Sequence, residues 1–415
     1  MLVTTERILF MKITMISNYI NHHQIPFSNA LYQKLGKDYH FIQTEPMEEE
    51  RVQMGWGLEA EQIPYVLFLD KDLEKCKELI DESDILLVGW MEREDLIEKR
   101  LSGNKLTIRI SERLYREGQW KAISPKGLLR KYKEHTSHRK HPIYLLCAGA
   151  YVASDFSIVK AYPQKMYQFG YFPETKIFTQ EELAKNHIWG NKKNDVEIQI
   201  VWAGRFIPLK HPEFVLKLGE NLKQLGYRFH IHFIGGGELE EELKQTAAQK
   251  QLEKEITFYG FLKPNQVRKV MEQSHIHLFT SNYLEGWGAV VNEGMNSGCA
   301  EVVNVQVGAA PFLICHGENG LVYQNGSYED MEKQVRFLLD NPQEGWRMGQ
   351  AAYKTIVHEW NAQEAAKRLL DFYEQFQNGK IVPPATGPFS EAEVISPKKM
   401  YSYMMEKGRK LIYEQ

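Results

Sequence analysis

The sequence predicts an α/β protein built from two doubly wound, Rossmann-like domains. Short apolar segments rich in β-branched residues alternate with stretches whose apolar residues recur at helical spacing, which is typical of strand–helix–strand units. Several apolar segments are continuous, as expected for parallel strands covered by helices on both faces. The chain of 415 residues is also long enough for two domains of ordinary size.

The elements follow this alternation along the chain. KITMISNYI predicts a first strand, and the spacing in NHHQIPFSNALYQKLG predicts the helix after it. Further strands are expected in DILLVGW and HPIYLLCAGAY, and in the second half in EIQIVWAG, FHIHFIGGG, EITFYG, HIHLFTSN and AEVVNVQ. GELEEELKQTAAQKQL predicts one of the intervening helices, and PKKMYSYMMEKGRKLIYE a last amphipathic helix after a Pro- and Gly-rich break.

A polar, Lys- and Asn-rich stretch between Phe178 and Ile198 predicts the domain boundary, since the second group of strands begins directly after it. We therefore expect a first domain at residues 1–185 and a second at 186–357. Residues 358–415 are expected to form C-terminal helices and a tail.

Composition excludes several classes of protein. Hydrophobic residues make up 43% and charged residues 25%, which is ordinary for a globular protein, and the net charge of -3 gives no general attraction to nucleic acid. The four cysteines show no disulfide framework and no metal-ligand spacing, which fits a reducing, cytoplasmic compartment. We expect neither a signal peptide nor a membrane-spanning helix, and Met11 is a candidate for the true start.

Charged and small residues follow three strands of the second half, where loops lead into helices. Arg205 and Lys210 follow the first of these strands, and three glycines, Gly235, Gly236 and Gly237, follow the second. Ligands bind at the carboxyl ends of strands in such sheets, and cationic side chains beside helix-start amides suit a diphosphate.

The third loop carries EGWGAVVNE, from Glu285 to Glu293. If the Gly-Trp-Gly turn opens a helix, Glu293 lies about two turns further in, on the order of 12 Å from Glu285 at about 1.5 Å per residue. That span suits a sugar nucleotide, with one carboxylate on the sugar, the other on the ribose, and glycine amides facing the phosphates. The alternative is a pair of solvated or capping carboxylates.

As an ordered set, these loops resemble those of retaining GT-B-fold glycosyltransferases of the glycosyltransferase family 4 kind. The matching segments are GRFIPLK, FIGGGELEEEL, ITFYGFL, the element from Glu285 to Glu293, and GENGLVY. EWNAQEAAKRLLDFYE also looks like the final helix region of that family, which crosses back to the first domain. The resemblance implies two domains facing a cleft, the first on the acceptor side and the second binding the nucleotide sugar.

The resemblance also implies roles for individual residues. Glu285 would bind hydroxyls of the donor sugar, Arg205 and Lys210 would neutralise the leaving diphosphate, and Glu293 would bind the ribose. Gly286, Trp287 and Gly288 would offer backbone contacts near the phosphates, Gly235, Gly236 and Gly237 would line the donor site, and Phe261 would lie near the base. Trp287 stands where that family more commonly has Phe.

The implied reaction is transfer of a sugar, of the hexosyl type, from a nucleotide diphosphate sugar to a glycan or lipid-linked acceptor, with retention at the anomeric carbon. No metal and no cofactor is expected, and cell-surface polysaccharide or glycolipid assembly is the expected setting. Two alternatives stay open: a sugar-nucleotide epimerase or hydrolase of the same fold, and a noncatalytic sugar-nucleotide-binding protein. An NAD-dependent oxidoreductase is disfavoured because Glu240 replaces the third glycine of the dinucleotide fingerprint.

The first half offers a weaker candidate, the loop SNYINHHQIP after the first strand. His22 or His23 can bind phosphate, orient an acceptor hydroxyl or shuttle a proton. The alternative is a helix start capped by Asn21 with exposed imidazoles. We take His22 as the catalytic candidate of this domain because its loop borders the expected cleft.

Two further segments have competing interpretations. KGLLRKYKEHTSHRKHP, residues 126–142, carries six Lys and Arg against one Glu and predicts either a contact with an anionic bilayer or a solvated basic helix. The bilayer interpretation places the protein in the cytoplasm, peripheral to the inner face of the cell membrane. Asp70 and Asp72 form a DxD pair, but the pattern of the second half points away from a metal site there.

Overall fold

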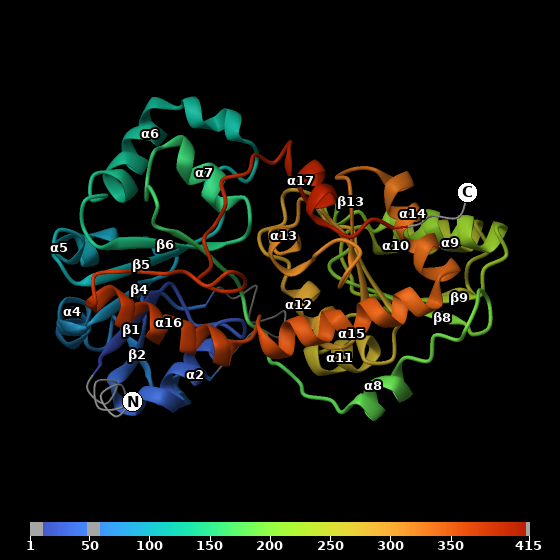
Figure 1. The fold of residues 1–415 in the computed structure, drawn as a ribbon, viewed down its shortest axis with the longest axis horizontal. Helices are drawn as coiled ribbons and strands as arrows, with labels where there is room; N and C mark the ends of the chain where they lie inside the picture. The colour runs from blue at the N-terminus through green and yellow to red at the C-terminus, as the bar shows by residue number, and fades with distance from the viewer. Residues whose placement is uncertain (1–10, 48–58, 412–415) are drawn as a thin grey trace. The chain divides into compact units, whose positions relative to one another are not determined.

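The computed structural model describes residues 11–47 and 59–411, and the chain divides into two compact units (Figure 1). Unit 1 consists of Met1–Glu174 and Asn361–Ile395, and unit 2 of Thr175–Trp360 and Ser396–Gln415. The ten residues that precede the proposed start at Met11 lie outside the described part of the chain. Each unit contains one parallel sheet with helices around it, so the prediction of two doubly wound α/β domains is confirmed.

Unit 1 contains a seven-stranded sheet in the order β3-β2-β1-β4-β5-β6-β7, parallel throughout. Its strands are β1 (Ile13–Ser17), β2 (Tyr39–Gln43), β3 (Val66–Phe68), β4 (Ile85–Val88), β5 (Leu106–Ser111), β6 (Ile143–Ala148) and β7 (Met166–Phe169). Every residue of β1 and β4 is buried, because central parallel strands are covered on both faces. The continuous apolar runs in the sequence reflect this burial.

The helices of unit 1 lie in the connections between these strands, apart from one that comes from the C-terminal part of the chain. They are α2 (Ile25–Leu35), α4 (Leu73–Glu82), α5 (Glu98–Leu101), α6 (Pro125–Lys131), α7 (Val152–Ile158) and α16 (Ala362–Gln377). The predicted first helix begins at Ile25 rather than at Asn21, since residues 22–24 form a turn. Helix α16 packs beside α2, although more than 300 residues separate them in the sequence (Figure 1).

Unit 2 contains a six-stranded parallel sheet in the order β10-β9-β8-β11-β12-β13. Its strands are β8 (Ile198–Ala203), β9 (Phe229–Ile234), β10 (Ile256–Gly260), β11 (Ile276–Phe279), β12 (Ala300–Asn304) and β13 (Leu321–Tyr323). The strand order reverses between β8 and β11, so the loops after these two strands leave the sheet side by side in opposite directions. Such a switch point is where open α/β sheets bind ligands.

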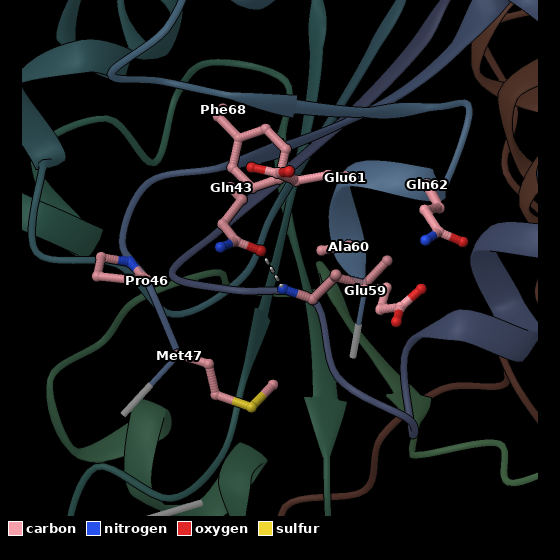
Figure 2. Close-up of a pocket in the computed structure, with 9 residues that line it drawn as sticks. Gln43, Pro46, Met47, Glu59, Ala60, Glu61, Gln62 and Phe68 are labelled. Atoms are coloured by element: carbon pink, nitrogen blue, oxygen red, sulfur yellow. Dashed lines mark hydrogen bonds between the residues drawn. The ribbon is translucent and has the colours of Figure 1, made fainter. Parts of the chain in front are cut away.

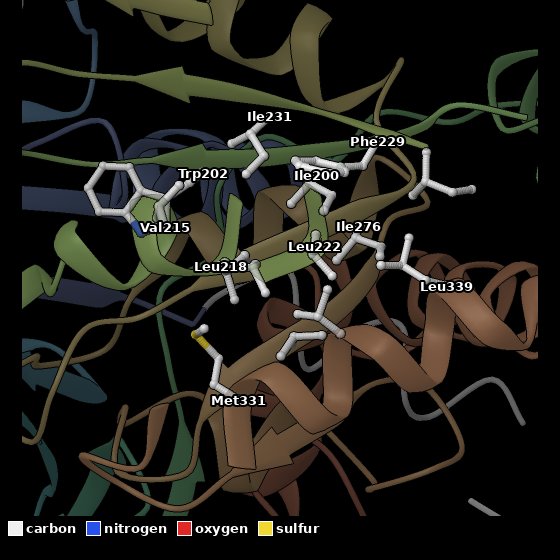
Figure 3. Close-up of a cluster of buried hydrophobic side chains, with 14 of the residues drawn as sticks. Ile200, Trp202, Val215, Leu218, Leu222, Phe229, Ile231, Ile276, Met331 and Leu339 are labelled. Carbon is white, nitrogen blue, oxygen red and sulfur yellow. The ribbon is translucent and has the colours of Figure 1, made fainter. Parts of the chain in front are cut away.

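Helices cover both faces of this sheet. They are α8 (Gln180–Asn186), α9 (Glu213–Gln224), α10 (Glu240–Gln249), α11 (Pro264–Met271), α12 (Ala289–Asn296), α13 (Ala310–Leu313), α14 (Tyr328–Asp340), α15 (Pro342–His358) and α17 (Met400–Lys407). Figure 3 shows the core on one face, where Ile200 and Ile231 of the sheet meet Leu218 of α9 and Met331 of α14. A smaller apolar cluster, with Met271 and Cys299, lies under α11 and α12.

The connecting segments divide between the units differently from the predicted ranges. The sequence placed the boundary at 185/186, whereas residues from Thr175 onward belong to unit 2. Tyr353 on α15 holds the start of this segment by hydrogen bonds to the amide and carbonyl of Phe178. The tail is also divided: Asn361–Ile395 belongs to unit 1, and the last segment, with α17, belongs to unit 2.

None of the helices in residues 11–47 and 59–411 combines the length and the apolar character needed to cross a bilayer.

Candidate functional site

The sequence-predicted site residues of unit 2 lie on the loops at the switch point and on the neighbouring β9 and β10 loops. Arg205 follows β8, and Lys210 ends a 3₁₀ turn at Pro208–Lys210 in the same loop. Gly235 to Gly237 follow β9, and the segment from Glu285 to Gly288 follows β11. The structure thus brings these predicted residues to one edge of one sheet.

The triglycine loop packs directly on the backbone of the β8 loop. Phe206 donates its amide hydrogen to the carbonyl oxygen of Gly236 at 2.8 Å, and Leu239 donates to the carbonyl oxygen of Phe206 at 3.1 Å. Gly235 and Gly237 have φ of 139° and 152°, and a Cβ on Gly235 would lie 1.8 Å from the carbonyl oxygen of Gly204. Glycine is therefore required here for the close approach of two backbones.

The structure joins Lys210 and Glu285, which the sequence analysis treated as separate charges. The Lys210 ammonium donates to Oε2 of Glu285, and the two side chains keep only 15% and 17% of their surface exposed. Lys210 Nζ also lies 4.9 Å from the centroid of the Phe279 ring. A cation and an anion are thus held together at the switch point with most of their surface buried.

Two hydrogen bonds fasten the loops that carry this ion pair. The Thr280 hydroxyl donates to the carbonyl oxygen of Lys210 at 2.5 Å, and it accepts a hydrogen bond from Trp202 Nε1 at 2.7 Å. The Asn282 amide donates to the carbonyl oxygen of Leu209 at 2.8 Å. The buried Trp202 therefore helps to hold the Lys210 loop in place through Thr280. Neither Trp202 nor Thr280 was singled out from the sequence.

Arg205 is exposed, and within residues 11–47 and 59–411 it takes part in no ion pair. Its guanidinium lies on the same loop as Lys210, five residues earlier. The guanidinium of Arg205 and the ammonium of Lys210 are groups of the kind that bind phosphates.

The Gly-Trp-Gly turn precedes α12 and does not form its first residues. Gly288 is the N-cap with a φ of 86°, and a Cβ there would lie 2.8 Å from Val307 and 2.9 Å from Phe279. Trp287 is buried, and its indole nitrogen donates to Oδ1 of Asn292 at 2.8 Å. The Trp287 side chain is therefore part of the core, while Gly286 is only partly buried.

Glu293 lies one helical turn into α12 and not two, because the helix begins only at Ala289. Its side chain is half-buried. Burial raises the pKa of the Glu293 carboxyl, while the charges of Arg268 and His277 act in the opposite direction. Glu293 thus lies, partly buried, on the helix that follows the turn carrying Glu285.

Phe261 follows Gly260, which ends β10 with a φ of 65°. The Phe261 ring is 66% exposed, so its face is available for stacking on a planar ligand.

In unit 1, His22 lies in the turn before α2. The Asn21 side chain accepts a hydrogen bond from the His23 amide at 3.0 Å, and Gln24, not Asn21, is the N-cap of the helix. The two imidazole rings lie 3.8 Å apart and are half-buried, with His23 stacked on Tyr171. Burial lowers the pKa of His22, which favours the neutral imidazole.

Unit 1 also contains a pocket of about 460 Å³ at the carboxyl ends of β2 and β3 (Figure 2). Gln43 and Phe68, the last residues of those strands, line it together with Ile20 of the loop that carries His22. Gln43 accepts a hydrogen bond from the Ile20 amide at 3.2 Å, shown by the dashed line in Figure 2. An amide and an aromatic ring thus meet on the edge of the sheet where ligands bind.

One residue of the DxD pair has a structural role. Asp72 is the N-cap of α4 and accepts a hydrogen bond from the Lys75 amide at 3.1 Å, while Asp70 is exposed. In the described part of the chain, no group of three or more His, Cys, Asp or Glu side chains is arranged to hold a metal ion.

Comparison with known proteins identifies the domain that carries the switch-point loops. Residues 184–355 match the family described as Glycosyl transferases group 1, so the chain contains a group 1 glycosyl transferase domain. An uncharacterized glycosyltransferase of Haemophilus influenzae is 28% identical over 170 residues, which are 39% of this chain and 47% of that protein. The amylovoran biosynthesis glycosyltransferase AmsK of Erwinia amylovora is 26% identical over 159 residues, 37% of this chain and 39% of that protein. The matches span about half the length of these relatives or less.

The likeness to solved structures extends over both units. The crystal structure of Anabaena Alr3699/HepE, in complex with UDP and glucose, is similar to 88% of this chain and all of that chain, with a TM-score of 0.59. At 12% identity this likeness concerns the fold, which is GT-B.

Proposed function

We propose that this protein is a retaining glycosyltransferase that moves a sugar from a nucleotide diphosphate sugar to a glycan or lipid-linked acceptor in cell-surface polysaccharide or glycolipid assembly. The observation that carries the proposal is the Lys210–Glu285 ion pair at the switch point of a group 1 glycosyl transferase domain. AmsK, named for amylovoran biosynthesis, and HepE, solved with UDP and glucose, support the class of reaction and of donor.

The ion pair gives the two residues complementary tasks. A diphosphate entering the loop competes with Glu285 for the Lys210 ammonium, and Arg205 adds a second positive charge. Glu285 is then released to accept hydrogen bonds from hydroxyls of the donor sugar. As the bond between sugar and diphosphate breaks, negative charge grows on the leaving oxygen, and the fixed cations stabilise it.

The other predicted residues of unit 2 would position the donor. The glycine backbones at 235–237 and 286–288 allow phosphates to approach, the exposed Phe261 ring stacks on the base, and Glu293 binds the ribose. With no nucleophilic side chain assigned, the acceptor attacks on the face that the diphosphate leaves, and the leaving phosphate takes its proton. Arg205 and Lys210 supply the charge neutralisation, so no metal is required in this scheme.

We propose that the acceptor binds to unit 1. The half-buried, neutral His22 suits a hydrogen bond with an acceptor hydroxyl, and the pocket beside it offers Gln43 and Phe68 to a sugar ring. A rise in the acceptor KM of Phe68→Ala, with donor binding unchanged, would support this placement, and an unchanged acceptor KM would refute it.

A contact between unit 1 and the inner face of the cell membrane would bring a lipid-linked acceptor to this site. The basic segment 126–142 begins within α6, and the chain just before it also exposes apolar side chains. The free thiols of all four cysteines agree with a reducing, cytoplasmic setting.

The experiment that tests the proposal is a binding and turnover screen with UDP-, GDP-, ADP- and CMP-sugars, without added metal. Donor binding raises the melting temperature of the native protein, and the anomeric configuration of the product is read by NMR. We expect one nucleotide class to bind, Glu285→Gln to bind it but turn it over slowly, and the product to retain configuration. Turnover of donor without any acceptor product would instead favour an epimerase or hydrolase, and binding without turnover a noncatalytic protein.

A further inference from the structure

A fully buried pair of ionisable side chains lies beneath the helix that carries Glu293. His277 on β11 and Glu301 on β12 are directly paired in the parallel register, and His277 Nδ1 lies 2.7 Å from Glu301 Oε2. Both side chains have no exposed surface. The pair therefore lies inside the sheet–helix interface of unit 2.

The two side chains of the pair are ionisable, whereas several neighbours on the same strands are apolar. Ile276, Leu278, Val302 and Val303 are all buried and apolar. In the described part of the chain, His277 Nε2 and Glu301 Oε1 have no hydrogen-bond partner. Apolar side chains of similar volume would be as stable or more stable at such a site, so stability alone does not account for the pair.

Helix α12 rests on this pair through Gly294. A Cβ at Gly294 would lie 2.3 Å from Glu301 Oε1 and 2.6 Å from His277 Nδ1. The helix backbone therefore lies directly against the two polar groups, at the residue that follows Glu293. The pair therefore determines how closely this turn of α12 approaches the sheet. The position of the Glu293 carboxylate depends on that distance.

Two side chains from other elements act on the charge of Glu293, namely Arg268 on α11 and His277 on β11. Glu301 on β12 lies against the next residue, Gly294. Burial raises the pKa of Glu293, and positive charge at Arg268 and His277 lowers it. On α15, which packs on the same helix, Tyr353 is hydrogen-bonded to the backbone of Phe178.

We infer that His277 and Glu301 are positioning residues for nucleotide binding: the pair fixes the helical turn that carries Glu293 and keeps its carboxylate available to the ribose hydroxyls of a nucleoside diphosphate. This inference rests on the proposed function, because it takes Glu293 as the ribose-binding residue. Glu301 Oε2 holds His277 Nδ1 at 2.7 Å beneath Gly294, so the loss of either side chain removes a contact that supports this turn of α12.

The test compares nucleoside diphosphates with a probe that lacks the ribose. Calorimetric affinities for UDP, GDP, ADP and inorganic pyrophosphate are measured on the full chain for the wild type and for Glu301→Gln, His277→Gln, Glu293→Gln and Glu301→Gln/Glu293→Gln. His275→Gln is the matched control, since His275 is a buried histidine of the same unit that is hydrogen-bonded to the backbone of Gln199 and Ile188.

We expect Glu301→Gln and His277→Gln each to weaken nucleoside diphosphate binding by about tenfold, leaving pyrophosphate within about twofold. The pH below which nucleotide affinity falls should move upward in His277→Gln, because Glu293 loses one of the two side chains that lower its pKa and is protonated more readily. In the Glu293→Gln background, Glu301→Gln should have no further effect, and His275→Gln should change neither quantity.

Four results would overturn the inference. Equal losses for pyrophosphate and nucleotide, or a full additional loss in the double variant, would show that the pair acts only on the fold. Should Glu301→Gln fail to fold, His277→Gln carries the same comparison, and an unchanged pH profile in it would be decisive. Absence of nucleotide binding by the wild type would overturn the proposed function as well.

Discussion

The ammonium of Lys210 is bonded to the carboxylate of Glu285 across the switch point of unit 2, although 75 residues separate them in the chain. In the proposed function, a donor would separate these two groups, with its diphosphate binding the Lys210 ammonium and its sugar binding the Glu285 carboxylate. The net stabilisation from this ion pair is limited, because partial burial removes both charged groups from water and this desolvation cost offsets their attraction.

Lys210→Ala should therefore lower kcat by about 10² to 10³, the range found when one donor to a developing negative charge is removed. The measurement is steady-state turnover of the donor identified by the binding screen. Lys217→Ala is the control, because Lys217 lies on the following helix and pairs with Glu329 at the surface. Equal rates for the two variants would contradict the role given to Lys210.

The sequence predicts that the candidate residues of unit 2 lie on loops at one edge of a sheet, because these residues follow strands, and the structure has them there. The sequence did not predict the Lys210–Glu285 contact, which depends on β8 and β11 being neighbours at the reversal of strand order. Periodicity identifies strands but does not order them within a sheet. The strands not singled out include β3 and β13, which have three residues each, too few for a clear pattern.

The first residue of α12 could not be predicted from the sequence either. Gly286 and Gly288 both fit a helix start, and only the left-handed backbone of Gly288 shows where the helix begins. The His277–Glu301 pair had a visible signal, a histidine within the apolar run HIHLF, but its partner lies on another strand. Without the register, neither residue could be assigned a partner.

Gly235→Ala should destabilise unit 2 and abolish donor binding, because its Cβ would lie 1.8 Å from the Gly204 carbonyl oxygen. Gly226→Ala is a matched control: Gly226 also has a positive φ, of 72°, but nothing lies within 4 Å of its added Cβ. The control should lose only about 1–2 kcal/mol, the cost of a left-handed backbone for alanine. Urea unfolding measures both, and a loss for Gly235→Ala no larger than for Gly226→Ala would argue against backbone contact.

The buried environment of His22 predicts a pH effect on stability. Because burial lowers its pKa in the folded state, the unfolded state binds the proton more readily, and stability falls as the pH drops below the free-histidine value near 6.5. His22→Gln should therefore lose less stability than the wild type on acidification. Urea unfolding about one unit above and below that pH tests this, with the exposed His358→Gln as control. Equal acid sensitivity of wild type and His22→Gln would contradict it.

The exposed apolar side chains beside the basic segment predict binding to anionic vesicles. Trp120, Ile123, Leu129 and Tyr132 are each more than half exposed, and lysines and arginines flank them. Tryptophan and aliphatic side chains enter the interfacial layer while basic groups contact anionic headgroups. Cosedimentation with phosphatidylglycerol vesicles should exceed that with phosphatidylcholine vesicles and fall at high salt.

The variant pair for this surface is Ile123→Ser with Leu129→Ser. The control pair is Ile177→Ser with Ile188→Ser, at two isoleucines of unit 2 that are also more than half exposed. The first pair should lose vesicle binding, and the second should retain it. Vesicle binding that both pairs retain would leave α6 a solvated basic helix, the alternative that the sequence analysis left open.

Trp287 offers a test of whether the turn before α12 is held by its core contacts. Its indole donates a hydrogen bond to Asn292 on the same helix, and its ring lies within 6.3 Å of Phe312 and 6.0 Å of Trp360. Trp287→Phe keeps an aromatic ring but leaves the Asn292 carbonyl oxygen buried without this donor, which costs about 1–3 kcal/mol. Trp120→Phe, at a 68% exposed site, should change the free energy of unfolding by less than about 0.5 kcal/mol. Gly288 follows Trp287 directly, and Glu293 lies on the helix that begins after it. Nucleotide affinity should therefore fall with stability in Trp287→Phe alone. Equal unfolding free energies for the two variants would show that the indole hydrogen bond does not hold this turn.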